Sequence, residues 1–191
     1  MGRLTVLALT AAAQWLVVAP PIRAASGAPR TVLHYGDSLT VGTGVYLRSF
    51  LPGWSITQSA SISRHADEGP GAVRSLSSSL PRVLVISLGA NDDPGAVAEF
   101  AADVRRISAT AGRGRCVIWS TVVRPPSDGI SYEGYNLVLR RAALTFANFR
   151  VFDWQALAKK HPLWFGSDGV HPTAEGYRAR AAALARLVRS C

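Results

Sequence analysis

Three side chains in this sequence are of the types that together carry out nucleophilic catalysis: Ser38, Asp168 and His171. A serine hydroxyl is a poor nucleophile until a base removes its proton, and the base works best when a third group fixes its tautomer. His171 is the candidate base, and Asp168 could reach the other imidazole nitrogen from the same loop. We therefore interpret the three residues as a candidate serine–histidine–aspartate triad.

An ester carbonyl attacked by a serine becomes an oxyanion, which needs preorganised hydrogen-bond donors. We expect the backbone N–H of Ser38 and the side-chain amide of Asn91 to supply them. Each candidate also has an ordinary structural explanation. Ser38 could cap a helix, Asn91 could shape a turn, and Asp168 and His171 could lie in a solvated loop. The prediction therefore depends on whether the fold brings these residues together.

The elements that must position these residues alternate between short apolar runs and longer amphipathic ones. The expected strands are 31–35, 54–59, 82–88, 116–122 and 150–152. The expected helices are 39–51, 69–79, 94–111, 132–147 and 172–188, with Pro94 in the first turn of the third. Strands 82–88 and 116–122 are mostly apolar, as parallel strands buried on both faces are. This rhythm predicts a single α/β domain with one parallel sheet of about five strands, covered on both faces.

Polar residues follow the strands of this sheet. Segments 36–38, 61–64 and 89–92 come directly after the first three strands, and segment 168–171 lies beyond the last. In open parallel sheets, ligands bind beyond the carboxyl ends of the strands. We therefore expect all four segments to meet at one edge of the sheet.

Three of these segments resemble signature blocks of the SGNH (GDSL-type) hydrolase superfamily, in the same order. They read Gly36-Asp37-Ser38-Leu39, Gly89-Ala90-Asn91-Asp92 and Asp168-Gly169-Val170-His171. The similarity covers about residues 31–187 and implies a flavodoxin-like three-layer α/β/α sandwich. It also implies a serine hydrolase with Ser38, His171 and Asp168 as its triad.

One block departs from the family pattern. Members usually have a glycine after the second strand, and its backbone N–H joins Ser38 and Asn91 in the oxyanion hole. This chain has Ala60-Ser61-Ile62-Ser63-Arg64-His65 at that point. Either Ser63 or Arg64 therefore takes the place of the glycine. A backbone N–H does not require a glycine, so the donor can be retained.

Further similarity, carried by segments 61–69, 151–154, 161–162 and 164–165, is to the extracytoplasmic SGNH domains of peptidoglycan O-acetyltransferases and related carbohydrate O-acetyl enzymes. The resemblance implies a secreted serine esterase that hydrolyses short-chain O-acyl esters through an acyl-enzyme, without a cofactor or metal. Its substrate would be a small-molecule, lipid or glycan ester. The alternatives are an O-acetyltransferase or deacetylase acting on cell-wall glycan, and a catalytically silent glycan-binding domain.

The beginning of the sequence has the pattern of a targeting segment. Arg3 precedes an almost wholly apolar run over residues 4–19, which Pro20 and Pro21 end, and small residues follow at 24–27. We predict a signal peptide over residues 1–27, a domain over 28–191 and a mature protein that begins between residues 25 and 28. An uncleaved anchor is the alternative, although the apolar run is shorter than the ~20 residues of a membrane span. Either arrangement places the domain outside the cytoplasm.

The formal net charge is +9. The arginines are scattered over helical segments, Arg178 and Arg180 among them, which indicates a solvated basic surface. No basic stripe with interleaved aromatic residues is present in the sequence, so nucleic acid is not an expected partner. Association with an anionic cell wall is compatible with the charge, and a monomer is expected.

The sequence has two cysteines, Cys116 and Cys191. Alone they provide too few ligands for a metal site, but in an oxidising compartment they are candidates for a disulfide. The last helix should run from the catalytic edge back to the opposite edge, where the fourth strand begins with Cys116. We therefore predict that the two residues form a disulfide.

Overall fold

The computed structural model describes residues 1–2 and 30–191. The predicted signal peptide, the alternative membrane anchor and the predicted start of the mature protein fall at residues 3–29, outside the described residues. Within the described part of the chain, no helix combines the length and apolar character that crossing a bilayer requires.

The centre of the domain is a sheet of five parallel strands in the order β2-β1-β3-β4-β5. The strands are β1 (Thr31–Gly36), β2 (Ser55–Ala60), β3 (Val83–Ser87), β4 (Cys116–Ser120) and β5 (Phe149–Phe152). Gly36 at the end of β1 is in register with Ala60 of β2 and Ser87 of β3. The carboxyl ends of these three strands are therefore level, and the segments that follow them start from one edge.

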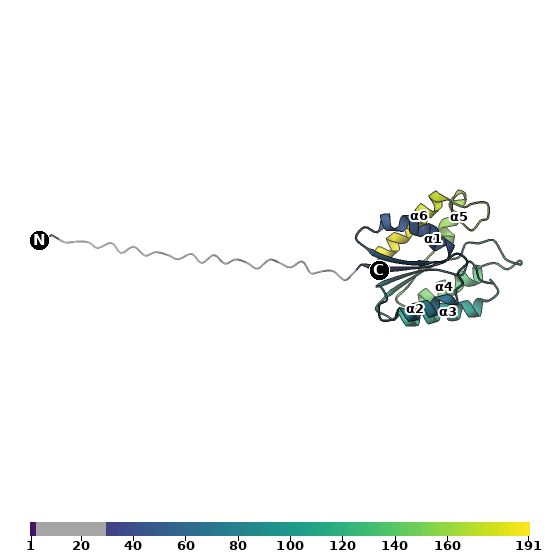
Figure 1. The fold of residues 1–191 in the computed structure, drawn as a ribbon, viewed down its shortest axis with the longest axis horizontal. Helices are drawn as coiled ribbons and strands as arrows, with labels where there is room; N and C mark the ends of the chain where they lie inside the picture. Colours follow the sequence, from purple (N-terminus) through teal and green to yellow (C-terminus); the bar gives the residue numbers. More distant parts are fainter. Residues whose placement is uncertain (3–29) are drawn as a thin grey trace.

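Helices cover both faces of the sheet, which confirms the predicted flavodoxin-like three-layer α/β/α sandwich (Figure 1). One layer holds α1 (Ser38–Phe50), α5 (Trp154–Lys159) and α6 (Ala174–Arg189), and the other holds α2 (Glu68–Ser75), α3 (Val97–Ala111) and α4 (Glu133–Thr145). A short 3₁₀ helix, η1 (Pro162–Trp164), follows α5.

Two details of the predicted helices are wrong. Helix α3 begins at Val97, so Pro94 is not in its first turn. Asp93 closes a separate turn around Pro94, because its side chain accepts from the backbone N–H of Gly95 at 2.9 Å and its carbonyl oxygen accepts from Ala96 at 2.9 Å. The prediction also omitted α5 and η1, which have six and three residues and are too short to show helical periodicity.

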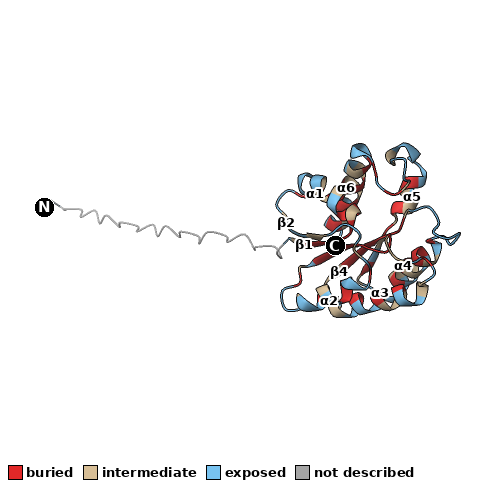
Figure 2. Cartoon of the chain, turned by 45° about the vertical axis from the view of Figure 1, so that its right-hand side comes forward, coloured by how far each residue is buried: buried red, intermediate tan, exposed pale blue. Residues whose placement is uncertain are grey.

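The buried side chains alternate between the two faces of the sheet, as the period of a strand requires. On β3, Leu84 and Ile86 pack against α2, α3 and α4, while Val83 and Val85 pack against α1 and α6. Figure 2 shows the buried residues concentrated in the strands and on the helix faces that cover them. Each helical layer therefore has its own hydrophobic core, and the sheet lies between them.

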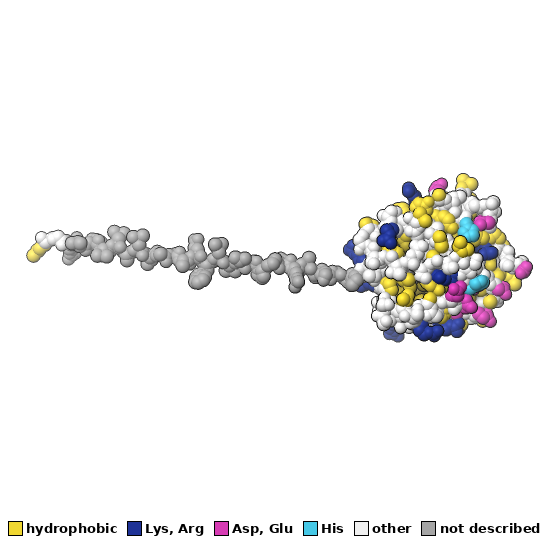
Figure 3. All heavy atoms as spheres, viewed as in Figure 1, with side chains coloured by type: hydrophobic (Ala, Val, Ile, Leu, Met, Phe, Trp, Pro, Cys, Tyr) yellow, Lys and Arg dark blue, Asp and Glu magenta, His cyan; other side chains and the backbone are white. Residues whose placement is uncertain are grey.

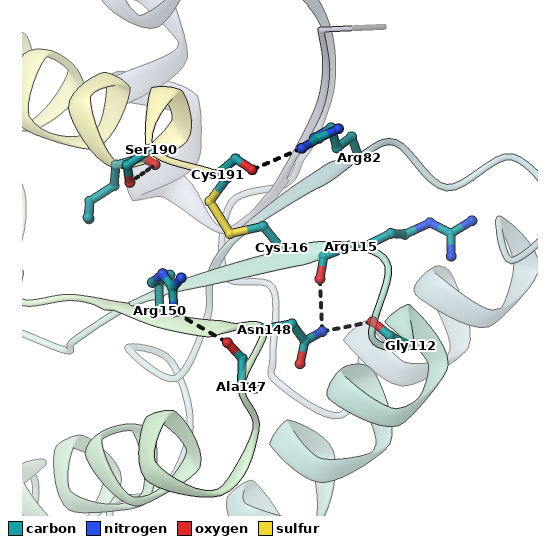
Figure 4. The surroundings of a disulfide bond; sticks show 10 residues. Arg82, Gly112, Arg115, Cys116, Ala147, Asn148, Arg150, Ser190 and Cys191 are labelled. Atoms are coloured by element: carbon teal, nitrogen blue, oxygen red, sulfur yellow. Dashed lines mark hydrogen bonds between the residues drawn. A yellow bond between two sulfur atoms is a disulfide. The ribbon is translucent and has the colours of Figure 1, made fainter. Parts of the chain in front are cut away.

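The predicted disulfide between Cys116 and Cys191 is present (Figure 4). It joins the first residue of β4 to the segment after α6, with the two Cα atoms 5.8 Å apart. The last helix does run back from the carboxyl edge of the sheet to the amino edge, as the sequence indicated.

Reduction of this disulfide should lower the free energy of unfolding by about 4 kcal/mol, because a crosslink that closes a long loop lowers the conformational entropy of the unfolded chain. The bond closes a loop with a sequence separation of 75 residues. Urea unfolding with and without a reductant measures the difference. A Cys116→Ser/Cys191→Ser variant is the control, since the reductant should not affect it. Two free thiols in oxidised, folded protein would contradict the prediction.

Candidate active site

Ser38 is the first residue of α1 and follows a tight turn at the end of β1. Asp37 caps the helix, because its Oδ1 accepts from the backbone N–H of Leu39 at 2.9 Å. The backbone N–H of Asp37 donates to the carbonyl oxygen of Ser87 at 3.1 Å, which ties the turn to β3. A Cβ at position 36 would overlap that same carbonyl oxygen, so only glycine allows β1 and β3 to approach this closely here.

The structure brings Ser38, His171 and Asp168 together in a chain of hydrogen bonds. The Oγ of Ser38 lies 2.9 Å from Nε2 of His171, and Nδ1 of His171 lies 2.7 Å from Oδ2 of Asp168. Ser38 and His171 are 133 residues apart in the sequence, so the fold alone makes this contact. The side chains of His171 and Asp168 are 48% and 50% exposed, which leaves the site open to solvent.

His171 and Asp168 are held by one turn between η1 and α6. Oδ1 of Asp168 accepts from the backbone N–H groups of Val170 at 2.9 Å and His171 at 3.0 Å. The hydrogen bond from the His171 side chain and those from the two backbone N–H groups hold the pKa of the Asp168 carboxyl well below its usual range. The carboxylate is therefore ionised at neutral pH and can orient the imidazole.

Asn91 follows β3 and its side-chain amide is fixed from two sides. Its Nδ2 donates to the carbonyl oxygen of Arg64 at 3.2 Å, and its Oδ1 accepts from Nη1 of Arg124 at 3.4 Å. Arg124 is itself anchored by a 2.6 Å hydrogen bond to the carbonyl oxygen of Ala90. Because the guanidinium can only donate, its contact sets which way the Asn91 amide faces. The second hydrogen of Nδ2 is left for another acceptor.

Of the two residues that could replace the family glycine, Ser63 has the backbone conformation that favours glycine. Its φ is 60°, in the left-handed region. The backbone N–H of Ser63 donates to no group among the described residues, whereas that of Arg64 donates to the carbonyl oxygen of Ser61 at 3.4 Å. The Arg64 side chain turns under the loop and donates to the carbonyl oxygen of Ser59 at 2.8 Å. The side chains of Ser63 and Arg64 form no hydrogen bond with Ser38, Asp168 or His171.

The loops after β2 and β3 are also joined to each other. Oδ1 of Asp92 accepts from the backbone N–H of Ala66 at 3.0 Å and lies 3.3 Å from Nδ1 of His65. Burial raises the pKa of the Asp92 carboxyl, and these two contacts oppose the rise. These contacts, together with that of Asn91 to Arg64, hold the two loops at a fixed separation.

Beneath Ser38 lies the buried guanidinium group of Arg180. Arg180 is 1% exposed and donates to the hydroxyl oxygens of Thr43 at 3.1 Å, Ser87 at 2.7 Å and Ser120 at 3.0 Å. The expectation that it belongs to a solvated basic surface was wrong, because it lies on the inner face of α6 between buried residues. Burial lowers the pKa of Arg180 to about 10, so it remains charged at neutral pH.

Two titratable groups share this interior with Arg180. Burial raises the pKa of Asp37 to about 6, although its hydrogen bond from Leu39 and the charge of Arg180 oppose the rise. Burial and the charge of Arg180 lower the pKa of His34 to about 3, so His34 is neutral. His34 is a packed histidine of β1 and takes no part in the triad hydrogen bonds.

A hollow of about 460 Å³ opens beside the triad. Arg124 and Gly169 are in its wall, so it adjoins both the Asn91 amide and the turn that holds Asp168. Tyr132 and Phe165 provide aromatic surface. The neighbouring Trp164 does not line the hollow and instead stacks on Trp154, with 6.1 Å between ring centroids.

Sequence reasoning did not assign the roles of Arg124 and Arg180. Arg124 follows β4 at the carboxyl edge, and a cation at that position was the available signal. Arg180 shares the inner face of α6 with Ala181 and Leu184, so its place in the helical period was the signal. Within the described residues, no group of three or more histidine, cysteine, aspartate or glutamate side chains is arranged to hold a metal.

The three-layer fold, with a hydrogen-bonded serine, histidine and aspartate at the carboxyl edge of its sheet, is that of a serine hydrolase. A family model confirms the class: the GDSL-like Lipase/Acylhydrolase family matches residues 34–179. The chain therefore belongs to this family. A search of curated protein sequences found no match.

Solved structures share the fold. The C-terminal catalytic domain of peptidoglycan O-acetyltransferase A from Streptococcus pneumoniae is 24% identical over 85% of this chain and 92% of that chain, with a TM-score of 0.66. A member of the lipolytic protein G-D-S-L family from Veillonella parvula is 14% identical over 84% and 99%, with a TM-score of 0.68. The esterase EstA from Pseudoalteromonas sp. is 16% identical over 84% and 97%, with a TM-score of 0.62.

The buried carboxyl of Asp37 gives a testable dependence of stability on pH. In an Asp37→Asn variant the amide oxygen can still accept from Leu39, but nothing titrates at this position. The folded carboxyl has a pKa of about 6, above its usual value of 3.8, so the folded wild type binds the proton more tightly than the unfolded chain does. Between pH 4 and pH 7 the stability of the wild type relative to the variant should therefore fall by about 2 to 3 kcal/mol.

Urea unfolding of both proteins across this range measures the difference. The other titrating groups are common to both proteins and cancel in the comparison. The prediction would be contradicted if the free energy of unfolding of the wild type rose relative to that of Asp37→Asn as the pH increased. That result would mean that the ionised carboxyl stabilises the fold.

Proposed function

We propose that this chain is an extracytoplasmic serine esterase that hydrolyses short-chain O-acyl esters through an acyl-enzyme on Ser38. The observation that carries the proposal is the unbroken chain of hydrogen bonds from Asp168 through His171 to Ser38, with distances of 2.7 and 2.9 Å. It is the arrangement that turns a serine hydroxyl into a nucleophile. The disulfide supports the extracytoplasmic location, because disulfides persist in oxidising compartments.

In the proposed reaction, Oγ of Ser38 attacks the ester carbonyl while Nε2 of His171 takes its proton. The tetrahedral intermediate collapses, His171 returns the proton to the leaving alcohol, and the acyl group remains on Ser38. Water, deprotonated by Nε2 of His171, then attacks the acyl carbonyl, and His171 returns the proton to Oγ of Ser38 as the acid leaves. Asp168 accepts a hydrogen bond from Nδ1 of His171 throughout, which fixes the tautomer and stabilises the imidazolium.

Three donors are available to the oxyanion in this proposal. They are the backbone N–H groups of Ser38 and Ser63 and the free Nδ2 hydrogen of Asn91. The left-handed backbone of Ser63 and its unengaged N–H favour it over Arg64 for this role. Arg124 acts on the oxyanion through Asn91, because its guanidinium fixes the direction of the amide.

A second candidate function is acyl transfer to a glycan hydroxyl, in which the acceptor replaces water in the second half-reaction. It is favoured by the likeness to the catalytic domain of a peptidoglycan O-acetyltransferase, the neighbour with 24% identity. The half-exposed triad also leaves room for a large acceptor. Turnover of a chromogenic acetate with and without a glycan acceptor separates the two functions. Hydrolysis unaffected by any acceptor supports the esterase, and a new acylated glycan supports transfer.

Substitution of the triad residues should reduce turnover of a chromogenic acetate to unequal extents. Ser38→Ala and His171→Ala should each remove nearly all activity, because one forms the acyl-enzyme and the other moves its proton. Asp168→Ala should cost less, because Asp168 orients the imidazole and exchanges no proton. Ser61→Ala is the control, since the Ser61 hydroxyl makes only a 3.4 Å contact to its neighbour's carbonyl oxygen.

A serine-directed fluorophosphonate gives a second measurement on the same variants. It should label the wild type and Ser61→Ala but not Ser38→Ala. Full activity in Ser38→Ala, or a wild type that the probe leaves unlabelled, would exclude the mechanism and favour a silent binding domain.

Asn91→Ala should lower kcat by about 10²–10³, with a smaller change in KM, if Asn91 donates to the oxyanion. The triad hydrogen bonds do not involve Asn91, so Ser38 and His171 should remain paired. Asn91→Asp should be at least as harmful, because a carboxylate cannot donate and repels the oxyanion.

Measurement of Tm on the same samples separates catalysis from structure, since Asn91 also joins the loop after β3 to Arg64. An unchanged kcat with a lowered Tm would restrict Asn91 to shaping the loop. Arg124→Ala should lower kcat in the wild type but have little further effect in Asn91→Ala, because it acts through that amide.

A further inference from the structure

A second hollow, of about 540 Å³, lies at the opposite edge of the sheet, where β3 and β4 begin. It is beside the disulfide (Figure 4), and four arginines line it: Arg82, Arg113, Arg115 and Arg150. They come from the segments before β3 and β4 and from β5 itself. The fold of the sheet, rather than one helix, therefore gathers these four cations, and we call the hollow with its four arginines the arginine hollow.

Backbone carbonyl groups hold two of these arginines in place. Arg115 donates to the carbonyl oxygens of Leu80 at 3.2 Å and Ala111 at 3.1 Å. Arg82 donates to the carbonyl oxygen of Cys191 at 3.3 Å. The two acceptors of Arg115 are neutral carbonyl groups, so they fix its side chain without offsetting its charge, whereas the acceptor of Arg82 belongs to the last residue of the sequence.

The other two arginines are less engaged. The Arg150 side chain makes one hydrogen bond of 3.4 Å, to the carbonyl oxygen of Ala147, and the Arg113 side chain makes none to the part of the chain that the structure describes. Among the described residues, no ion pair involves any of the four, and no aspartate or glutamate lines the hollow. Arg113 and Arg150 are therefore the guanidinium groups most available to a ligand.

The walls of the arginine hollow are fixed. Nδ2 of Asn148 donates to the carbonyl oxygens of Gly112 and Arg115, both at 2.8 Å, which joins the start of β5 to the segment before β4 (Figure 4). The disulfide of Cys116 and Cys191 joins the same segment to the end of α6. Because these links do not depend on a ligand, the four arginines are gathered before any anion arrives.

The distribution of acidic residues favours an anion at this edge. Many of the acidic side chains belong to the segments at the carboxyl edge. They include Asp67, Glu68, Asp92, Asp93 and Asp168. In Figure 3, the acidic side chains of the face in view lie on its right-hand side. An anionic ligand is therefore drawn to the amino edge and repelled from the triad edge.

We propose that the arginine hollow binds an anion that carries two or more phosphate groups, such as a stretch of phosphodiester polymer. The planar guanidinium donates two parallel hydrogen bonds to a phosphate, which makes arginine the side chain suited to this group. One phosphate could not contact arginines on opposite walls of a hollow of about 540 Å³, but successive phosphates could. Phe146 is the one aromatic residue that lines the described hollow, so it lacks the stacking surfaces that single-stranded nucleic acids use.

In this proposal the protein binds the polyanion at the amino edge of its sheet and carries the triad at the carboxyl edge. The strands of the sheet, up to six residues long, separate the two edges by roughly 20 Å. A protein held on a polyanion by the arginine hollow therefore points its triad away from that surface.

Calorimetric titration with tripolyphosphate at constant ionic strength tests the proposal. Arg113→Ala/Arg150→Ala should weaken binding by about tenfold or more, since each arginine makes charge-assisted hydrogen bonds to the ligand. The matched control is Arg74→Ala/Arg105→Ala, which removes the same charge from exposed positions on α2 and α3, outside the hollow. Its affinity should stay within about twofold of the wild type if the hollow is the site. Arg113→Glu serves as a second variant if the double variant does not fold.

The outcomes divide clearly. Equal weakening in the two double variants, or no measurable binding to the wild type, would overturn the proposal, because the charge would then act diffusely or not at all. Tighter binding of a single-stranded oligonucleotide of equal charge would overturn it in favour of a nucleic-acid site. A soluble poly(glycerol phosphate) and phosphatidylglycerol vesicles identify the source of the phosphates, and binding to either that Arg113→Ala/Arg150→Ala weakens supports the proposal. Ester turnover should be unchanged in all these variants, so this test is independent of the catalytic one.

Discussion

The geometry of the proposed triad depends on how closely α6 packs against α1 and the sheet. Ser38 begins α1 and His171 lies just before α6, so the relative position of the two helices sets the 2.9 Å distance between Oγ and Nε2. The ring of Tyr177 on α6 occupies the space that a Cβ at Gly42 of α1 would fill. A larger residue at position 42 would separate the helices and, with them, the base from its nucleophile.

Arg180 fixes the same packing from within. Burying a guanidinium is costly unless hydrogen bonds replace those lost from water. The partners of Arg180 belong to α1, β3 and β4, so one side chain ties α6 to three other elements. It also lies beneath the turn that holds Ser38, where its charge opposes the effect of burial on Asp37. The interior of this layer is therefore polar directly under the site and apolar elsewhere.

The sheet, the two helical layers and the meeting of Ser38, Asp168 and His171 could all be predicted from the sequence. Apolar runs that alternate with amphipathic ones indicate a parallel sheet, and a parallel sheet brings the carboxyl ends of its strands to one edge. The disulfide could be predicted for the same reason, since a helix that begins at one edge must end at the other. These features follow from patterns that extend over many residues.

Features that depend on a single side chain could not be predicted in this way. The burial of Arg180 contradicts the usual place of an arginine, and only its hydroxyl partners on distant elements explain it. The choice between Ser63 and Arg64 was open because backbone conformation at one loop residue is not encoded in a repeating pattern. Proline is common at the start of a helix, but here the side chain of Asp93 closes a separate turn around Pro94. In each case a local contact outweighs a general preference.

The turn that holds Asp168 and His171 should open at a lower free energy than the one that unfolds the whole domain. An isolated bridge between Phe165 and Pro172 and a 2.9 Å hydrogen bond from Gly166 to His171 close this turn, and most of its tip is exposed. A segment with few buried contacts opens at a lower free energy than the domain as a whole. We therefore expect both residues to leave their positions together while the sheet and its helices persist, so that the site loses its geometry at a lower temperature than the one at which the domain melts.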